Sequence, residues 1–327
     1  MRASSRNSAS RACVVAAVIC IALLAVAGCA PSVHRAPPDT HHVTIKHALY
    51  PHFPVYSDVS VVANQVYERP HGQPMLLDVC LPTGDARTSR PAIVAVHGGG
   101  WTHGSKTESD FRNVCEWLAS AGYVTVSVNY RLAPKYEYPD AVHDVEYAVE
   151  WLRKRAQVQR FSIDPAKIGI LGSSAGGNLA ALVGTDGSGS LTTGHRVAAV
   201  VDLSGPTNLT AKAADNAELI PNINSYLGCS TLARCPRARV ASANYHVDPT
   251  DPPFFVANST KELIPLSQPE SFVAALRTAG ISVRFDEVEG DSHAVKMLHS
   301  SVRDQIIDFL HATLGDPRGH PSSVARR

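Results

Sequence analysis

Two glycine-rich motifs, each preceded by a short apolar run, constrain the fold of this chain more than any other feature. They are HGGGW at 97–101 and GSSAG at 172–176. The apolar runs before them, 92–96 and 168–171, have the length and composition of buried parallel strands. Ligands bind where loops leave the carboxyl ends of such strands. The motifs therefore predict an α/β fold whose chemistry lies at that edge, centred on Ser174.

The second motif has the pattern of a nucleophilic serine. In Gly-x-Ser-x-Gly a strand turns sharply into a helix, and Gly172 and Gly176 relieve the crowding around the serine. A helix that starts near Ala175 directs its dipole and its free N–H groups at the reacting oxygen. We expect the Ala175 amide to bind an oxyanion. Gly99 and Gly100 are expected to do the same, because glycines let a loop backbone approach closely.

Each motif alone is also consistent with an ordinary loop. Both occur together, in the expected order and roughly 75 residues apart, as two intervening βα units require. With two further segments they resemble the α/β-hydrolase fold and, within it, the hormone-sensitive-lipase-like carboxylesterases. The four segments are HGGGW with Gly104, NYRLAP at 129–134, GSSAGGNLA at 172–180 and GDSH at 290–293.

This resemblance extends from about Leu76 to Leu314. It implies a mostly parallel central sheet flanked by helices. It also implies that carboxylic esters are hydrolysed through an acyl-enzyme, without a metal or an organic cofactor.

The order of catalytic residues in this fold, serine then acid then histidine, points to the remaining candidates. His293 follows the last predicted strand within a short turn, so it is the expected base. The acid is where the chain departs from the family, because Lys261 stands where related chains usually carry aspartate. We expect the neighbouring Glu262 to orient the base. The alternatives are Asp291, Asp251 and no third carboxylate at all.

The N-terminus has the pattern of an export signal. Arginines precede an apolar stretch, 12–27, that is short for a spanning helix and ends in small residues before Cys29. The ending resembles a bacterial lipoprotein box, which implies a signal peptide over 1–28 and a lipid on Cys29 that anchors the exported protein to a membrane of the cell envelope. A plain secretory signal and an uncleaved anchor are the alternatives. Residues 29–55 are then a flexible tether.

Composition is consistent with one large domain beyond the tether, since hydrophobic residues make up 44% of the chain and charged residues 18%. We predict a catalytic domain over 56–316 and a disordered tail over 317–327. The segment 207–251 is too long for an ordinary connection and is predicted to be an inserted lid. Within it, Tyr226 and Leu227 either line an apolar slot or form the lid's own core.

Charge and cysteine usage argue against two classes of function. The 30 basic and 29 acidic residues are interspersed, so the chain shows no electrostatic footprint for nucleic acid. No Cys-x-x-Cys pair or zinc-type histidine spacing occurs, which argues against a metal mechanism. In an oxidising compartment we expect a disulfide between Cys229 and Cys235. Cys80 and Cys115 are equally consistent with buried thiols.

The sequence is thus interpreted as a serine carboxylesterase or lipase, acting on small-molecule or lipid esters with short to medium acyl chains. Two other functions fit the same residues. One is hydrolysis of an amide or a sugar ester by the serine at the same strand–helix turn, as in a formamidase, a peptidase or a sugar deacetylase. The other is a non-catalytic envelope protein that binds a ligand in the pocket, which Lys261 favours.

Overall fold

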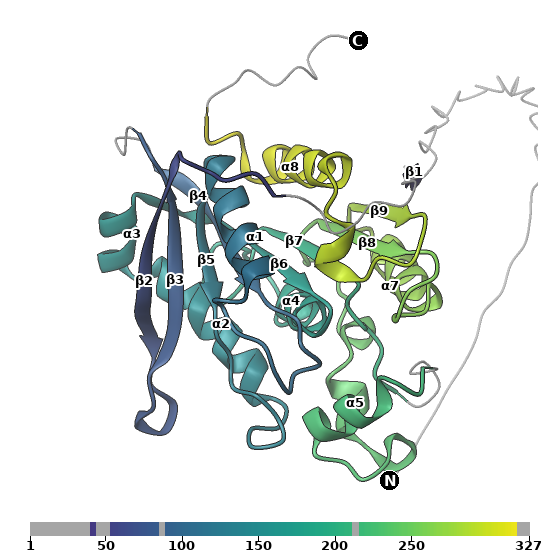
Figure 1. Ribbon diagram of the computed structural model, residues 1–327. Coiled ribbons are helices and arrows are strands. Elements are labelled where there is room, and N and C mark those ends of the chain that lie inside the picture. Colours follow the sequence, from purple (N-terminus) through teal and green to yellow (C-terminus); the bar gives the residue numbers. More distant parts are fainter. Residues whose placement is uncertain (1–39, 44–52, 85–88, 211–215, 319–327) are drawn as a thin grey trace, which may run out of the picture. The chain divides into compact units, whose positions relative to one another are not determined.

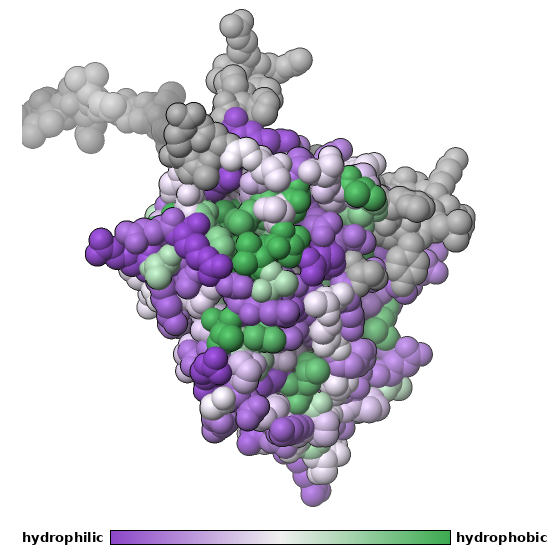
Figure 2. Space-filling model, turned by 60° about the vertical axis from the view of Figure 1, so that its left-hand side comes forward, coloured by the Kyte–Doolittle hydropathy of each residue, from purple (hydrophilic) through white to green (hydrophobic). Residues whose placement is uncertain are grey.

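The computed structural model describes residues 40–43, 53–84, 89–210 and 216–318. The proposed signal peptide and Cys29 lie outside the described residues. Within the described ranges, no helix is long and apolar enough to cross a bilayer. On the face shown in Figure 2, hydrophobic side chains form separate patches among hydrophilic ones.

A nine-stranded sheet forms the centre of the domain (Figure 1). The strands are β1 (Thr40–Val43), β2 (Val59–Glu68), β3 (Met75–Pro82), β4 (Arg90–Val96), β5 (Val124–Val128), β6 (Ile163–Ser173), β7 (Ala199–Leu203), β8 (Phe254–Ser259) and β9 (Val283–Val288). Their spatial order is β1-β9-β8-β7-β6-β4-β5-β3-β2. β3 runs antiparallel to both of its neighbours, and the other adjacent strands are parallel. The expected mostly parallel sheet is therefore present.

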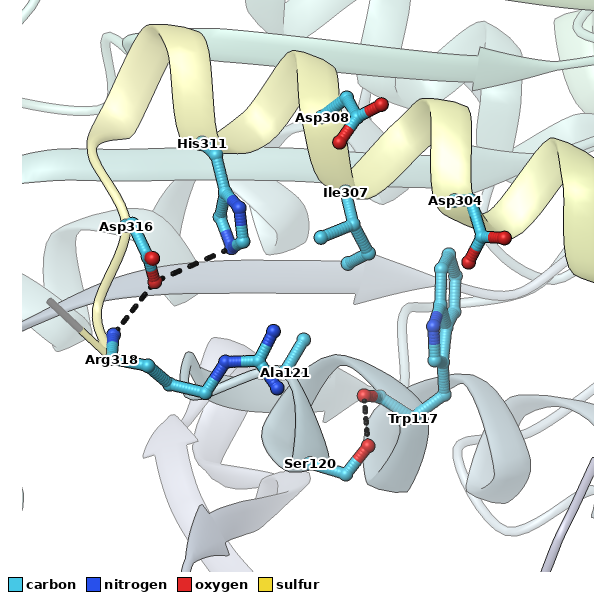
Figure 3. Close-up of a pocket in the computed structure, with 9 residues that line it drawn as sticks. All are labelled: Trp117, Ser120, Ala121, Asp304, Ile307, Asp308, His311, Asp316 and Arg318. Carbon is cyan, nitrogen blue, oxygen red and sulfur yellow. Dashed lines mark hydrogen bonds and ion pairs between the residues drawn. The ribbon is translucent and has the colours of Figure 1, made fainter. Parts of the chain in front are cut away.

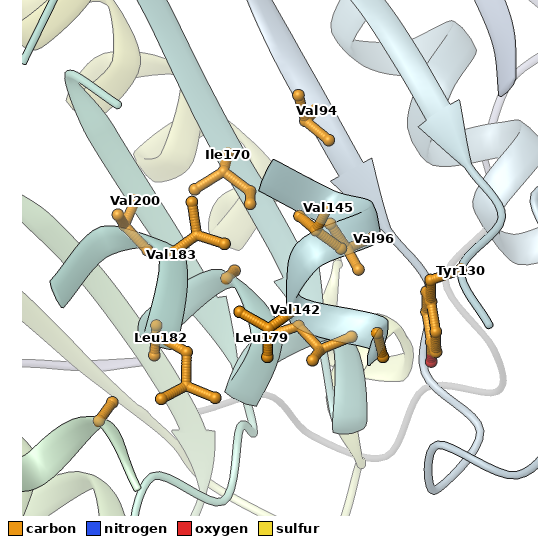
Figure 4. Close-up of a cluster of buried hydrophobic side chains, with 14 of the residues drawn as sticks. Val94, Val96, Tyr130, Val142, Val145, Ile170, Leu179, Leu182, Val183 and Val200 are labelled. Carbon is orange, nitrogen blue, oxygen red and sulfur yellow. The ribbon is translucent and has the colours of Figure 1, made fainter. Parts of the chain in front are cut away.

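Helices cover both faces of this sheet. The helices of the described residues are α1 (Ser109–Ser120), α2 (Asp140–Arg153), α3 (Arg155–Phe161), α4 (Ala175–Thr185), α5 (Ile220–Leu227), α6 (Arg237–Val240), α7 (Ser267–Thr278) and α8 (Ser300–Leu314), of which α5 and α6 lie in the insert between β7 and β8. Alternate residues of a strand point to opposite faces. Ile93 of β4 accordingly packs in one apolar cluster with α1 and α8. Val94 belongs to the other cluster, which includes Val145 of α2 and Leu179 of α4 (Figure 4).

The predicted insert, 207–251, lies between β7 and β8, and its described residues, 207–210 and 216–251, contain α5, α6 and two short 3-10 turns. Tyr226 of α5 is fully buried and its ring stacks on Trp101, with 4.6 Å between the ring centroids. Cys229 and Cys235 form a disulfide within the same segment. The insert is therefore packed against the domain through its own aromatic contact.

One sequence prediction is corrected by the structure, and one question that the sequence left open is answered. Thr40–Val43, inside the predicted flexible tether, pair in parallel with β9 at one edge of the sheet. The tether prediction is thus wrong for these four residues. For Cys80 and Cys115, which the sequence left open between a disulfide and buried thiols, the structure has a disulfide, because β3 and α1 bring their Cα atoms to 5.9 Å, a normal separation for a disulfide.

Candidate active site

Ser174 lies at the sharp turn between β6 and α4, as the Gly-x-Ser-x-Gly pattern predicts. Its φ of 55° is in a region that residues with a Cβ rarely adopt. A Cβ on Gly172 would meet the carbonyl oxygen of Gly176. A Cβ on Gly176 would meet the carbonyl oxygens of Val96 and His97. The turn is therefore pressed against the end of β4, from which the first glycine motif continues.

His293 and Glu262 complete a chain of contacts that begins at Ser174. The Ser174 hydroxyl lies 2.9 Å from His293 Nε2, and His293 Nδ1 pairs with Glu262 Oε2. A proton on Nδ1 is shared with the carboxylate, which leaves Nε2 to accept the serine proton. The structure thus brings together the residues expected as nucleophile, base and acid, each from a different loop.

Glu262 is fixed by two donors besides His293. Ser204 Oγ donates to Glu262 Oε1 at 2.6 Å, and the Ser259 N–H donates to the same oxygen at 3.1 Å. Ser204 Oγ also accepts from the Ala294 N–H at 2.9 Å. One buried hydroxyl therefore joins the acid to the loop that carries the base. Sequence analysis missed Ser204, because its local signal is only a Ser-Gly-Pro sequence at the end of a strand.

The other candidates for the acid lie elsewhere. Asp251 pairs with Arg196, and Asp291 is exposed. The Lys261 side chain is 77% exposed and lies 4.0 Å from Glu289. Although Lys261 stands where related chains usually carry aspartate, Glu262, one residue later, therefore places a carboxylate beside the base.

The glycine loop lies against the same cavity as Ser174. Gly98, Gly99 and Gly100 all line this cavity. Gly99 has φ 110° and Gly100 has φ 54°, which are conformations that favour glycine. Ala175 begins α4, so its N–H belongs to the first helical turn, where backbone donors have no partner within the helix. The structure therefore places all three expected oxyanion donors around or next to Ser174.

A buried histidine and a tyrosine hold the glycine loop. His97 Nδ1 donates to the Gly98 carbonyl oxygen at 2.7 Å, and the His97 ring stacks on Tyr130 at 4.2 Å between centroids. The Tyr130 hydroxyl donates to the His97 carbonyl oxygen at 3.0 Å. Burial lowers the pKa of His97 to about 4, so this imidazole is neutral near pH 7. Both side chains support the loop without lining the cavity.

The cavity at Ser174 has a volume of about 380 Å³ and a mixed lining. Its apolar side chains are Phe111, Leu219, Leu263, Ala294 and Val295, and its polar ones include His103, Glu108, Asp110, Asn222 and Lys296. A Cβ on Gly100 would meet the Asn222 side chain, so α5 packs directly on the glycine loop. The insert thus forms part of the wall through Leu219 and Asn222, whereas Tyr226 and Leu227 belong to the buried core.

A larger cavity, of about 510 Å³, lies between α1 and α8 (Figure 3). It shares no lining residue with the cavity at Ser174. Its serine, Ser120, donates to the carbonyl oxygen of Trp117 at 2.8 Å. Its histidine, His311, pairs with Asp316. Of these two cavities, the one at Ser174 is therefore the one in which a serine contacts a histidine.

Comparison with known proteins identifies the family. Residues 77–276 match the family model named BD-FAE. Esterase LipC of Mycobacterium tuberculosis (strain ATCC 25618 / H37Rv) is 32% identical over 237 residues, which cover 68% of this chain and 57% of LipC. Arylacetamide deacetylase of Bos taurus is 39% identical over 106 residues, which cover 32% of this chain and 27% of that protein. This chain thus covers less than two thirds of the length of either relative.

The fold is shared with solved esterase structures. A truncated form of a carbohydrate esterase from gut microbiota superposes with a TM-score of 0.67 at 23% identity, covering 81% of this chain and 99% of that one. This likeness confirms the predicted α/β-hydrolase fold. Since the family match extends over more than half of the sequence, the chain belongs to the BD-FAE family.

Proposed function

We propose that this protein hydrolyses carboxylic esters through an acyl-enzyme on Ser174. The observation that carries the proposal is the contact between Ser174 Oγ and His293 Nε2, with Glu262 behind the imidazole. A serine hydroxyl becomes a useful nucleophile near neutral pH when such a base is in place. LipC, an esterase by name, supports the same chemistry. The finer placement among hormone-sensitive-lipase-like carboxylesterases rests on the HGGGW and NYRLAP motifs.

In the acylation step, Ser174 Oγ attacks the ester carbonyl carbon while His293 Nε2 takes the hydroxyl proton. Glu262 keeps the imidazole oriented and stabilises its charged form. The carbonyl oxygen becomes an oxyanion, which the N–H groups of the glycine loop and of the start of α4 bind. The intermediate then collapses, and the alcohol leaves with the proton from His293. Water attacks the acyl-enzyme with the same base and releases the acid.

Esters that join a short acyl group to a polar alcohol fit the cavity best. Its volume of about 380 Å³ lies at the small end of the range for ligand pockets, about 300–1,000 Å³. Glu108, Asp110 and Asn222 offer hydrogen-bond partners for hydroxyl groups. A sugar ester is accordingly the second candidate substrate. The carbohydrate esterase of the same fold supports this choice by its name.

Ser174→Ala tests the reaction. Wild type should react with a fluorophosphonate probe and release nitrophenol from nitrophenyl acetate, whereas the variant should lose both activities, with turnover down about 10⁶-fold as in other triads. Ser120→Ala, which changes the serine of the larger cavity, is the matched control and should keep both. An unlabelled wild type would instead favour a non-catalytic binding protein.

Substrate choice needs a separate measurement. Turnover of nitrophenyl acetate, butyrate and octanoate should decline with acyl length, because the cavity is small. Release of acetate from an acetylated xyloside is the direct test of the sugar-ester candidate. Preference for octanoate would contradict the short-acyl proposal and leave the serine chemistry untouched.

We also propose that the protein is exported and held at the cell envelope by a lipid on Cys29. The arginines, the apolar stretch and the small residues before Cys29 support this assignment. Cys29→Ser should move the protein from the membrane fraction to the soluble fraction of cells. Retention of the variant in the membrane would indicate an uncleaved anchor instead.

A further inference from the structure

Three side chains from separate segments meet at the end of α4 that is remote from Ser174. Glu146 lies on α2, Asp186 follows the last residue of α4, and His195 lies in the loop before β7. One potential ligand atom from each lies within 4.8 Å of the other two. α4 has 11 residues, so at 1.5 Å per residue the cluster is about 16 Å along the helix from Ser174. The cluster is therefore separate from the proposed active site.

We propose that Glu146, Asp186 and His195 bind a divalent transition-metal ion, for which Zn²⁺ is the best match. Zinc accepts imidazole nitrogen together with carboxylate oxygen, whereas Ca²⁺ and Mg²⁺ prefer oxygen ligands alone. Zinc–ligand distances of about 2.0–2.2 Å put the ligand atoms of one ion about 3–4 Å apart. The 2.9 Å between His195 Nε2 and Asp186 Oδ2 is already close to that spacing, and small side-chain rotations bring in Glu146.

His195 Nε2 and Asp186 Oδ2 already form an ion pair across 2.9 Å, and the two side chains are 28% and 54% exposed. Both ligand atoms are therefore directed at the same point. An ion bound there takes the place of the imidazole proton, because a metal ligand must be deprotonated.

The charge around the cluster also favours a cation. Glu146 and Asp186 place two carboxylates together, and Asp186 caps the C-terminus of α4, where the helix dipole is negative. The last turn of α4 itself contains no basic residue, and Arg196 binds the carbonyl oxygens of Asp186 and Gly187 just beyond it. A divalent ion would neutralise the two carboxylates.

Two arginines fix the backbone that carries Asp186 and His195. Arg196, directly after His195, donates to the carbonyl oxygen of Asp186 and so ties the two ligand positions together. Arg153 of α2 donates to the carbonyl oxygen of Gly194 at 2.6 Å and holds the loop against the helix that bears Glu146. Positions fixed in advance lose little conformational freedom when an ion binds.

A fourth ligand is available in the small cavity beside the cluster, which has a volume of about 170 Å³. His143 and His246 line this cavity together with Glu146 and Asp186. His246 Nε2 donates to the Val240 carbonyl oxygen at 2.8 Å, which leaves its Nδ1 as a donor to metal. An ion here ties α2 to the end of α4, so its role is structural.

The zinc content of the full chain, prepared without an affinity tag, tests this proposal. After dialysis against buffered Zn²⁺, wild type should hold one more ion per chain than His195→Gln, as measured by plasma mass spectrometry. Glu146→Gln should lose the same ion. His71→Gln changes an exposed histidine in the turn after β2 and should retain it. Binding by other histidines cancels in these differences.

Zinc should also raise the midpoint of thermal unfolding of wild type by several degrees and leave that of His195→Gln unchanged, because only the native cluster binds the ion. Equal zinc content in wild type and His195→Gln would overturn the proposal, and so would an equal loss in His71→Gln. If circular dichroism shows that His195→Gln does not fold, Asp186→Asn takes its place, since the Asp186 side chain is 54% exposed.

Discussion

The two ends of helix α4 each hold a carboxylate–histidine pair, and the pairs differ in their third partner. At the N-terminal end, Glu262 and His293 meet the hydroxyl of Ser174. At the C-terminal end, Asp186 and His195 meet a second carboxylate. The same two chemical groups, a carboxylate and an imidazole, therefore serve proton transfer at one end and suit a cation at the other.

Burial and the helix dipole reinforce this difference. The Glu262 side chain is fully buried and accepts two further hydrogen bonds, whereas that of Asp186 is 54% exposed. A buried, fully bonded carboxylate stays in one position and orients an imidazole, while an exposed one turns readily toward an ion. The positive end of α4 faces a developing oxyanion, and its negative end faces a cation. Surroundings, rather than residue type, decide what such a pair does.

The largest effect is expected when the carboxylate of the N-terminal pair is neutralised. Glu262→Gln should lower kcat by about 10⁴-fold, because the amide neither holds the required tautomer nor stabilises the charged imidazole. Asp186→Asn is the same chemical change at the other end and should leave turnover of nitrophenyl acetate unchanged. Comparable losses in the two variants would mean that both ends of α4 serve the reaction.

Ser204→Ala should have a smaller effect at the same end. The change removes a hydrogen bond from Glu262 and leaves the Ala294 N–H without its acceptor. We expect kcat to fall by about 10- to 100-fold, with KM unchanged. Ser242→Ala is the matched control, because this buried serine also accepts from a backbone N–H and donates to a carbonyl oxygen. A drop in thermal stability alone, equal in both variants, would reduce Ser204 to a structural role.

Sequence patterns predicted the parts of the site that depend on backbone sterics and chain order. The glycines around Ser174 are required by contacts with their neighbours, so the turn is recognisable from five consecutive residues. His293 and Glu262 follow strands whose order is set by the fold. The same reasoning predicted the parallel strands, because buried strands are short continuous apolar runs.

Contacts between distant segments were not predictable in this way. Ser204 reaches Glu262 across 58 residues, and Cys80 reaches Cys115 across 35. The Glu146, Asp186 and His195 cluster has no regular spacing, so a search for zinc-type motifs passes over it. Such partners are decided by how helices and loops pack, and no local pattern records them.

A second carboxylate near the N-terminal end of α4, Asp202, should make stability depend on pH. Its Oδ1 accepts from the Gly205 N–H, and a Cβ on Gly177 of α4 would meet the same oxygen. Burial, opposed by that hydrogen bond and reinforced by the charge of Glu262, raises the pKa of Asp202 from 3.8 to about 7. The neutral form is therefore favoured in the folded protein.

The free energy of unfolding should consequently fall between about pH 4 and pH 7, because the unfolded chain ionises Asp202 first. The raised pKa of about 7 corresponds to about 4 kcal/mol at most. Asp202→Asn removes this dependence. The melting temperature of the variant, relative to that of wild type, should therefore increase as the pH rises from 5 to 8. The exposed Asp308→Asn is the control. Parallel melting curves for Asp202→Asn and wild type across this range would show that Asp202 is ionised throughout.

Removal of divalent ions should have the smallest effect on turnover. None of Glu146, Asp186 and His195 lines the cavity at Ser174, and they lie about 16 Å along α4 from it. Dialysis against EDTA should therefore lower the melting temperature while kcat for nitrophenyl acetate stays the same, both measured on one sample and again after Zn²⁺ is added. If turnover fell and Zn²⁺ restored it, the result would show that an ion at the C-terminal end of α4 affects the reaction at Ser174, and the two ends of the helix would not be independent.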